Sequence, residues 1–284
     1  FRAASALLGS AFATSLSHLQ VSCDFETCIA LLRLPQLKTL LVELSDNQLP
    51  NCPFEQKFAS NLLNLQLTGR HVLGSDGLSA FLSALSAPAL RWLSLLRVVV
   101  DAQTVLAISR LSSLCLLDLS SDTNQWPEYP SFECLTRLTS LQHFDFGEIR
   151  HDGLPNVARI TQLQSLNFAI DDLSIVDDDG WKQALLPLHD LSRLRAVHTI
   201  SLQQLSEGAL RSLPKTVTEL SLIVGTRELA PQSGFPWLSR ADCLPALQML
   251  ELVVLDGDFE EFKQRARVVR PSLEVRQRIG PRAT

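Results

Sequence analysis

The sequence lacks several segments that would place it in a familiar class. No run of about 18 uncharged apolar residues occurs in its 284 residues, so we expect no transmembrane helix. Its six cysteines form no CxxC pair and no terminal cluster, so neither a disulfide framework nor a zinc site is expected. No Asn-x-Ser/Thr acceptor is present. Together these absences favour free, buried thiols and an intracellular protein, cytoplasmic or nuclear.

The chain also lacks a concentration of positive charge. It carries 25 Lys and Arg against 30 Asp and Glu, and its net charge is −5. The basic residues are dispersed, whereas a nucleic-acid or anionic-membrane surface normally needs a clustered basic footprint. We therefore expect neither nucleic acid nor membrane as a partner.

Motifs of catalysis and metal binding are missing as well. There is no P-loop, G-x-S-x-G elbow, H-E-x-x-H or dinucleotide fingerprint. The VDDDG stretch (176–180) fails as an EF-hand because Ile175 and Leu186 stand where acids are required. His143 with Asp145, and His151 with Asp152, have no nucleophile or third ligand that the sequence places beside them. We expect no enzyme, no cofactor and no metal site.

The beginning of the chain is apolar without being a signal peptide. Residues 1–13 have no basic leading segment and start at Phe1. We interpret them as a helix belonging to a longer chain whose N-terminal part is missing.

What the sequence does contain is a repeat. The apolar frame L-x-x-L-x-L, with Val, Ile or Phe allowed, recurs along nearly the whole chain at a mean step of about 25 residues. The central apolar residues of the copies stand at 19, 40, 65, 93, 117, 144, 166, 200, 220, 250 and 273. In an extended segment the last two apolar residues of each frame share one side, so stacking parallel strands buries them in a continuous core.

Some of the return segments between the strands are predicted to be helices. Apolar residues at i, i+3, i+4 and i+7 mark helices in two returns, and a further stripe precedes the last strand. The stripes are Leu78, Phe81, Leu82 and Leu85; Trp181, Ala184, Leu185 and Leu188; and Phe259, Phe262, Ala266 and Val269. Ser75 and Asp101 are candidate N-caps.

From about residue 13 to 276 the chain resembles a leucine-rich-repeat protein. The family's usual Asn or Cys after the frame is absent, and the steps are irregular, which is more similar to F-box/LRR proteins and the ribonuclease-inhibitor-like group. The resemblance implies an α/β solenoid over 1–284: a curved arc with parallel strands on its concave face and helices and loops on its convex face. It also implies that partners dock on the concave face.

The residues that flank the apolar pair of each frame predict that face. It carries six carboxylates (Glu43, Asp118, Asp145, Glu219, Glu251 and Glu274) against one base, Arg276. Asp118 and Asp145 occupy equivalent places, about 5 Å apart, so they should repel each other and attract Lys, Arg or a metal ion. The candidate partner-binding residues are Trp92, Leu96, Leu116, Asp118, His143, Asp145, Glu219 and Glu251. A Trp among charged neighbours is typical of an interaction hot spot, although the leucines and Trp92 could simply pack together beside solvated acids.

Three functional readings follow from the resemblance. The first is the substrate-recognition part of an F-box/LRR-like ubiquitin ligase receptor, which would bind a protein through a basic and apolar segment. The second is a ligase-independent scaffold or inhibitor of the ribonuclease-inhibitor-like type. The third is the targeting arm of an enzyme whose catalytic domain lies outside the sequence. Long connections at 120–132, 171–183 and 225–238 are further candidate contacts.

Overall fold

A computed structural model describes most of the chain, and it divides the chain into two compact units, Phe1–Gly147 and Glu148–Thr284. The described residues are 15–45, 58–73, 76–120, 132–149, 153–170, 178–201, 207–224, 236–240, 242–254 and 259–279. Several predicted features lie outside them: the helix over 1–13, the N-cap Ser75, Cys52, the His151/Asp152 pair, and most of the three long connections.

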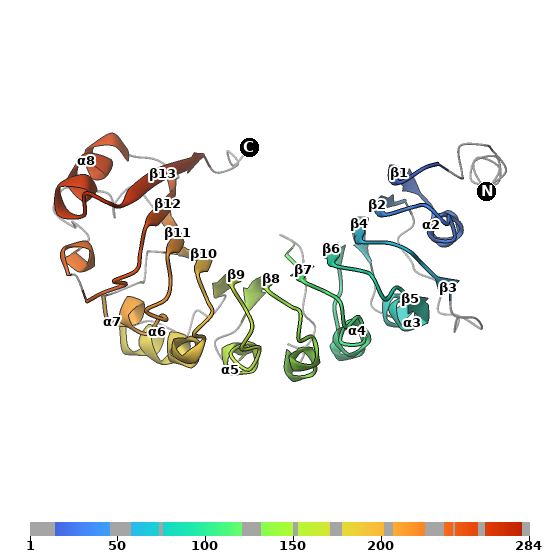
Figure 1. The fold of residues 1–284 in the computed structure, drawn as a ribbon, viewed down its shortest axis with the longest axis horizontal. Helices are drawn as coiled ribbons and strands as arrows, with labels where there is room; N and C mark the ends of the chain where they lie inside the picture. Colours follow the sequence, from blue (N-terminus) through green and yellow to red (C-terminus); the bar gives the residue numbers. More distant parts are fainter. Residues whose placement is uncertain are drawn as a thin grey trace. The chain divides into compact units, whose positions relative to one another are not determined.

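The first unit is a stack of parallel strands with helical returns (Figure 1). The described strands follow one another in chain order: β1 (His18–Cys23), β2 (Thr39–Leu44), β4 (Asn64–Leu73), β6 (Trp92–Val98), β7 (Leu116–Asp118) and β8 (His143–Ile149). The returns contain α2 (Phe25–Leu32), α3 (Asp76–Ala84), α4 (Ala102–Ile108) and the 3₁₀ helix η2 (Phe132–Arg137), while β3 (Phe58–Ala59) pairs with β5 (Leu85–Ser86). Within this unit the helices lie along one side of the strand row.

The second unit repeats the plan. Its described strands are β9 (Ser165–Ile170), β10 (Ala196–Ser201), β11 (Glu219–Val224), β12 (Met249–Val254) and β13 (Glu274–Ile279), again parallel and in chain order. Its returns contain α5 (Leu154–Val157), α6 (Asp178–Leu185), η4 (Leu186–Asp190), α7 (Glu207–Arg211), η6 (Pro236–Ser239) and α8 (Phe259–Val269). The fold is therefore the predicted α/β leucine-rich-repeat solenoid. That all repeats form a single domain stays a prediction.

The strand register in the first unit matches the predicted frame. Leu19, Leu40, Leu65, Leu93, Leu117 and Phe144 stand opposite one another on consecutive strands. All but Leu19, which lies on the edge strand, are at most 1% exposed. Since side chains alternate across a strand, fixing these residues in the core also fixes which residues face away from it.

In the second unit the predicted register is wrong at two places. The residue opposite Leu166 is Val197 and not Ile200, because Leu191, Leu194 and Val197 supply an overlapping frame that packs in the core. The ladder to β11 shifts between Val197 and Ile200. In the last repeat Val275, and not Leu273, stands opposite Leu250, although both side chains are buried.

The predicted helices bury the stripes that the sequence marks, with one exception. The stripes of α3 and α6 are buried, including Trp181 at 2% exposure. In α8, Phe259, Phe262 and Ala266 are buried, but Val269 is 46% exposed because it ends the helix as the chain turns toward β13. Among the described helices none combines the length and hydrophobicity needed to cross a membrane.

The five described cysteines form no disulfide with one another, and the expectation of buried thiols holds for two of them. Cys28 and Cys243 are fully buried, whereas Cys23, Cys115 and Cys134 are partly exposed. Burial raises the pKa of the Cys28 thiol above its ordinary value, which keeps this side chain in its neutral, unreactive form.

Two helices start at an aspartate cap. The Thr104 N–H donates to Asp101 Oδ1 at 2.7 Å, which confirms the predicted N-cap of α4. The Thr27 N–H donates to Asp24 Oδ1 at 2.7 Å in α2, a cap that the sequence analysis missed. Asp24 directly precedes an i, i+3, i+6, i+7 apolar stripe (Phe25, Cys28, Leu31, Leu32), the signal that could have revealed it.

Replacing Asp24 with Ala is expected to lower the unfolding free energy of the first unit by about 1 kcal/mol at pH 7. Hydrogen bonds from Thr27, its side chain first and then its backbone N–H, lower the pKa of Asp24 below the ordinary 3.8. The carboxylate therefore contributes stability that is complete above pH about 4 and is lost as pH falls through the lowered folded pKa. Urea titrations from pH 7 to pH 2.5 should show the difference between wild type and variant shrinking at acid pH. Glu43→Ala, which removes an exposed carboxylate without a cap, should change stability by less than about 0.5 kcal/mol; a similar loss there would contradict the cap assignment.

Candidate functional site on the exposed strand face

Each strand of the first unit turns up to three side chains away from the core, and the register aligns them in rows. We call these residues the exposed strand face. The first row is His18, Thr39, Asn64, Trp92, Leu116 and His143; the second is Gln20, Leu41, Gln66, Ser94, Asp118 and Asp145; the third is Ser22, Glu43, Thr68 and Leu96. Neighbouring members of a row are on the order of 4.8 Å apart, the spacing of paired strands.

The structure brings five of the predicted site residues together on β6, β7 and β8. Trp92, Leu116 and His143 are direct neighbours in the first row, and Ser94, Asp118 and Asp145 follow in the second. Trp92 and Leu116 are half-buried and His143 is exposed. Leu96 lies four residues beyond Trp92 on the same strand, opposite Thr68, so it is separated from Trp92 and Leu116 by Ser94.

Asp118 is held by hydrogen bonds within the protein. Its Oδ2 accepts from the Ser94 hydroxyl at 2.9 Å, and its Oδ1 accepts from the Ser120 N–H at 2.9 Å and the Ser120 hydroxyl at 2.6 Å. Asp145 makes a related turn, since its Oδ1 accepts from the Gly147 N–H at 3.2 Å. Each aspartate thus accepts a hydrogen bond from the backbone N–H two residues on, Asp118 at the end of β7 and Asp145 within β8. The equivalence of the pair is confirmed, but Asp118 uses its oxygens internally, which makes it a poor receptor for a partner's cation.

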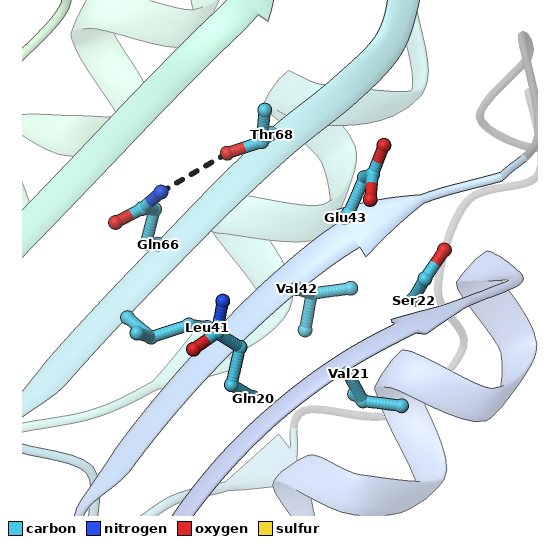
Figure 2. Close-up of a pocket in the computed structure, with 8 residues that line it drawn as sticks. All are labelled: Gln20, Val21, Ser22, Leu41, Val42, Glu43, Gln66 and Thr68. Atoms are coloured by element: carbon cyan, nitrogen blue, oxygen red, sulfur yellow. Dashed lines mark hydrogen bonds between the residues drawn. The ribbon is translucent and has the colours of Figure 1, made fainter.

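A shallow groove of 350 Å³ opens over β1, β2 and β4 (Figure 2). It is lined by Gln20, Val21, Ser22, Leu41, Val42, Glu43, Gln66 and Thr68. Gln66 Nε2 donates to Thr68 Oγ1 at 3.1 Å, which orients both side chains along β4. Glu43 is exposed, and no hydrogen bond or ion pair joins its carboxylate to another residue of the described ranges. The sequence analysis counted Glu43 among the acids of the face but did not single out this groove.

Two strand-face acids of the second unit, Glu251 and Glu274, have partners within that unit. The Ser221 hydroxyl donates to Glu251 Oε2 at 3.1 Å, and Arg278 lies 3.9 Å from the same oxygen. Arg276 Nε donates to Glu274 Oε1 at 2.7 Å, a hydrogen bond that lowers the pKa of the Glu274 carboxyl. Glu219 stands opposite Met249 on the next strand. The hydrogen bond and charge of Glu274 raise the pKa of Arg276 most, and the charges of Glu251 and Glu219 add to this shift. The outward side of the second unit's strands therefore carries mixed charge, because β13 places Arg276 and Arg278 beside the glutamates.

The exposed strand face of the first unit differs in this respect. Among its described row members there are three carboxylates and two histidines, but no Lys or Arg. Within the described ranges no group of three or more His, Cys, Asp or Glu side chains is arranged to hold a metal ion. The arrangement offers apolar surface, hydrogen-bonding groups and negative charge to a partner.

Comparison with known proteins gives likenesses of shape only. No protein-family model and no curated protein matches the sequence. Among solved structures, an internalin (inlF) from Listeria monocytogenes is similar over 99% of this chain and 94% of its own, with 18% identity and a TM-score of 0.43. TLR13 in its complex with ssRNA13 is similar over 94% of this chain and 50% of its own, with 14% identity and a TM-score of 0.34. At these values neither protein's function transfers to this chain.

Proposed function

We propose that this protein is a binding module that docks another protein on the exposed strand face of the first unit and catalyses no reaction itself. The observation that carries the proposal is the in-register row of Trp92, Leu116 and His143, with Asp118 and Asp145 beside it, on a side of the strands where no described helix packs. A half-buried Trp beside polar groups is the usual composition of an interaction hot spot. Three carboxylates without Lys or Arg favour a protein over a nucleic acid.

For the biological setting we favour substrate recognition in an F-box/LRR-like ubiquitin ligase receptor. The support is the irregular repeat length and the missing Asn or Cys of the frame, which resemble that group. A ligase-independent scaffold or inhibitor of the ribonuclease-inhibitor-like type uses the same surface. An F-box, which is a separate helical element, in the full-length protein would distinguish the first from the second. Glu219 and Glu251 remain proposed contacts, with their charge already balanced by Arg276 and Arg278.

Replacing Trp92 with Ala is expected to weaken binding of the protein's principal partner about 30-fold or more, because hot-spot truncation costs on the order of 2 kcal/mol. The partner would be captured on tagged full-length protein from native cells, identified by mass spectrometry, and its dissociation constant measured with purified proteins. Recovery of a cullin and an F-box adaptor with the partner would support the ligase reading; a partner without them would support the scaffold.

Leu186→Ala is the matched control, since Leu186 is 48% exposed on the return side of the second unit. It should leave the dissociation constant unchanged. Equal affinity of the wild type and Trp92→Ala would contradict docking on this face. Asp118→Lys is less suitable as a test, because losing the bonds from Ser94 and Ser120 would disturb the strand end itself.

A further inference from the structure

The third row of the exposed strand face holds an acid that is unpaired among the described residues and an apolar side chain at a fixed separation. Glu43 on β2 stands opposite Thr68 on β4, and Thr68 stands opposite Leu96 on β6. Glu43 is exposed, and Thr68 and Leu96 are half-buried. Since the strands are about 4.8 Å apart, the carboxylate and the Leu96 side chain are separated by on the order of 10 Å.

The groups between the two ends suit a polypeptide backbone. Thr68 Oγ1 accepts from Gln66 Nε2, which leaves the threonine hydroxyl proton and the Gln66 carbonyl oxygen available to a ligand. The groove of 350 Å³ lies on the Glu43 side of this position, between Ser22 and Thr68 (Figure 2). An extended chain crossing the strands would thus meet a donor and an acceptor midway between an acid and an apolar contact.

Charge fixes the orientation of such a chain. Glu43 makes no ion pair with a described residue, so a partner's Lys or Arg would complement it. Arg97 follows Leu96, is exposed, and leaves the regular strand with a left-handed backbone of φ 57°. A basic residue placed at the Leu96 end would therefore meet a like charge, whereas an apolar residue would not.

We propose that the third row recognises an extended protein segment in which a Lys or Arg and an apolar residue are about three positions apart. The separation follows from the 10 Å distance and the polyproline II form of an extended chain, which advances about 3.1 Å per residue and has three residues per turn, so that side chains three positions apart lie on the same side. The basic side chain pairs with Glu43 and the apolar side chain packs on Leu96, while Thr68 and Gln66 bind the backbone between them. This inference rests on the proposed function and specifies the chemistry of the partner.

The test is an array of synthetic nonapeptides of Ser, Thr and Ala that contain one Lys and one Leu. Lys and Leu are placed one to six positions apart, in both orders. Each labelled peptide is titrated in solution with the purified full chain, and fluorescence anisotropy of the peptide measures binding. The expected affinity is highest near a separation of three. Peptides without Lys, or with Glu in its place, are expected to bind about twofold to fivefold more weakly.

A charge exchange makes the result specific to Glu43. The Glu43→Lys variant should prefer the Glu-containing peptides, and Leu96→Ala should lose the preference for Leu. Glu26→Lys is the matched control, because Glu26 is an exposed acid in the first turn of α2 in the same unit, and it should behave as wild type.

Two outcomes separate this inference from the proposed function. An affinity independent of Lys–Leu separation, or unchanged by Glu43→Lys, would overturn the third-row assignment, as would failure of every peptide to bind. If Trp92→Ala still loses the captured partner in that case, the binding-module function stands and the partner uses the first row instead. If neither experiment shows an effect, both proposals fail.

Discussion

Replacing Phe144 with Ala is expected to lower the unfolding free energy of the first unit by about 3 to 5 kcal/mol. Phe144 is 1% exposed and lies in an aromatic cluster with Phe132 of η2 and Phe146 of β8. Its ring centroid is 5.5 Å from that of Phe132, in an edge-to-face arrangement, and 4.9 Å from that of Phe146. Truncation would leave a cavity between the strand and its return and would remove both ring pairs. Urea denaturation followed by circular dichroism measures the loss.

Two companion variants make the Phe144 result decisive. Phe144→Leu should cost only about 1 to 1.5 kcal/mol, because Leu occupies the equivalent core position at Leu93 and Leu117. His143→Ala should cost less than about 0.5 kcal/mol, since the adjacent residue points out of the core and is exposed. If His143→Ala destabilised the unit as much as Phe144→Ala, the strand would be one residue out of register and the exposed strand face would be wrong.

The second large effect is expected at Arg270, for which Arg270→Met should destabilise the second unit by about 3 kcal/mol. The guanidinium donates to four backbone carbonyls: Leu238 at 2.8 Å, Leu244 at 3.1 Å, Arg240 at 2.7 Å and Cys243 at 2.6 Å. These carbonyls belong to η6 and the following turn, where Leu244 has a left-handed φ of 50°. One side chain at the end of α8 thus fixes the return segment of the preceding repeat. A Met cannot donate, so partly buried carbonyls would lose their partners.

The forked shape of the Arg270 guanidinium, and not only its charge, is expected to stabilise the second unit. Arg270→Lys should recover less than half of the lost stability, because an ammonium is a point charge and cannot reach four carbonyls in different directions. Arg267→Met is the matched control on the exposed side of α8 and should be nearly neutral. Hydrogen exchange should show faster opening at the amides of Cys243 and Leu247, which donate within this turn. Slow exchange there in Arg270→Met would contradict the clamp.

The fold could be predicted because, in most repeats, the apolar residues of the frame fit only one strand register. Leu65 and Leu93 each have an apolar residue two positions on, with Gln66 or Ser94 between, so only one alternation buries the apolar pair. At residues 191–202 two overlapping frames share Leu194 and Val197, and their apolar spacing alone does not choose between them. The choice depends on packing against Leu166 and Leu220, which is a property of the neighbouring strands.

Part of the candidate site could be predicted because it depends only on strand register. The row of Trp92, Leu116 and His143 follows from register alone. The hydrogen bond from Ser94 to Asp118 does not, because it joins residues 24 positions apart whose rotamers depend on burial of the serine at 0% exposure. Likewise the charge balance of Glu251 needs Arg278, which the two-residue error in the last repeat placed outside the predicted face.

The register has a consequence for how such a chain changes over evolutionary time. Leu19 to Leu40 spans 21 residues and Leu65 to Leu93 spans 28, yet both pairs stand in line with their neighbouring strands. Insertions and deletions in the returns therefore leave the rows aligned, whereas a single residue gained inside a strand would turn its outward side chains inward. Lineages can lengthen the returns freely and still preserve a recognition surface. The same tolerance makes the returns suitable sites for grafting foreign segments in engineering.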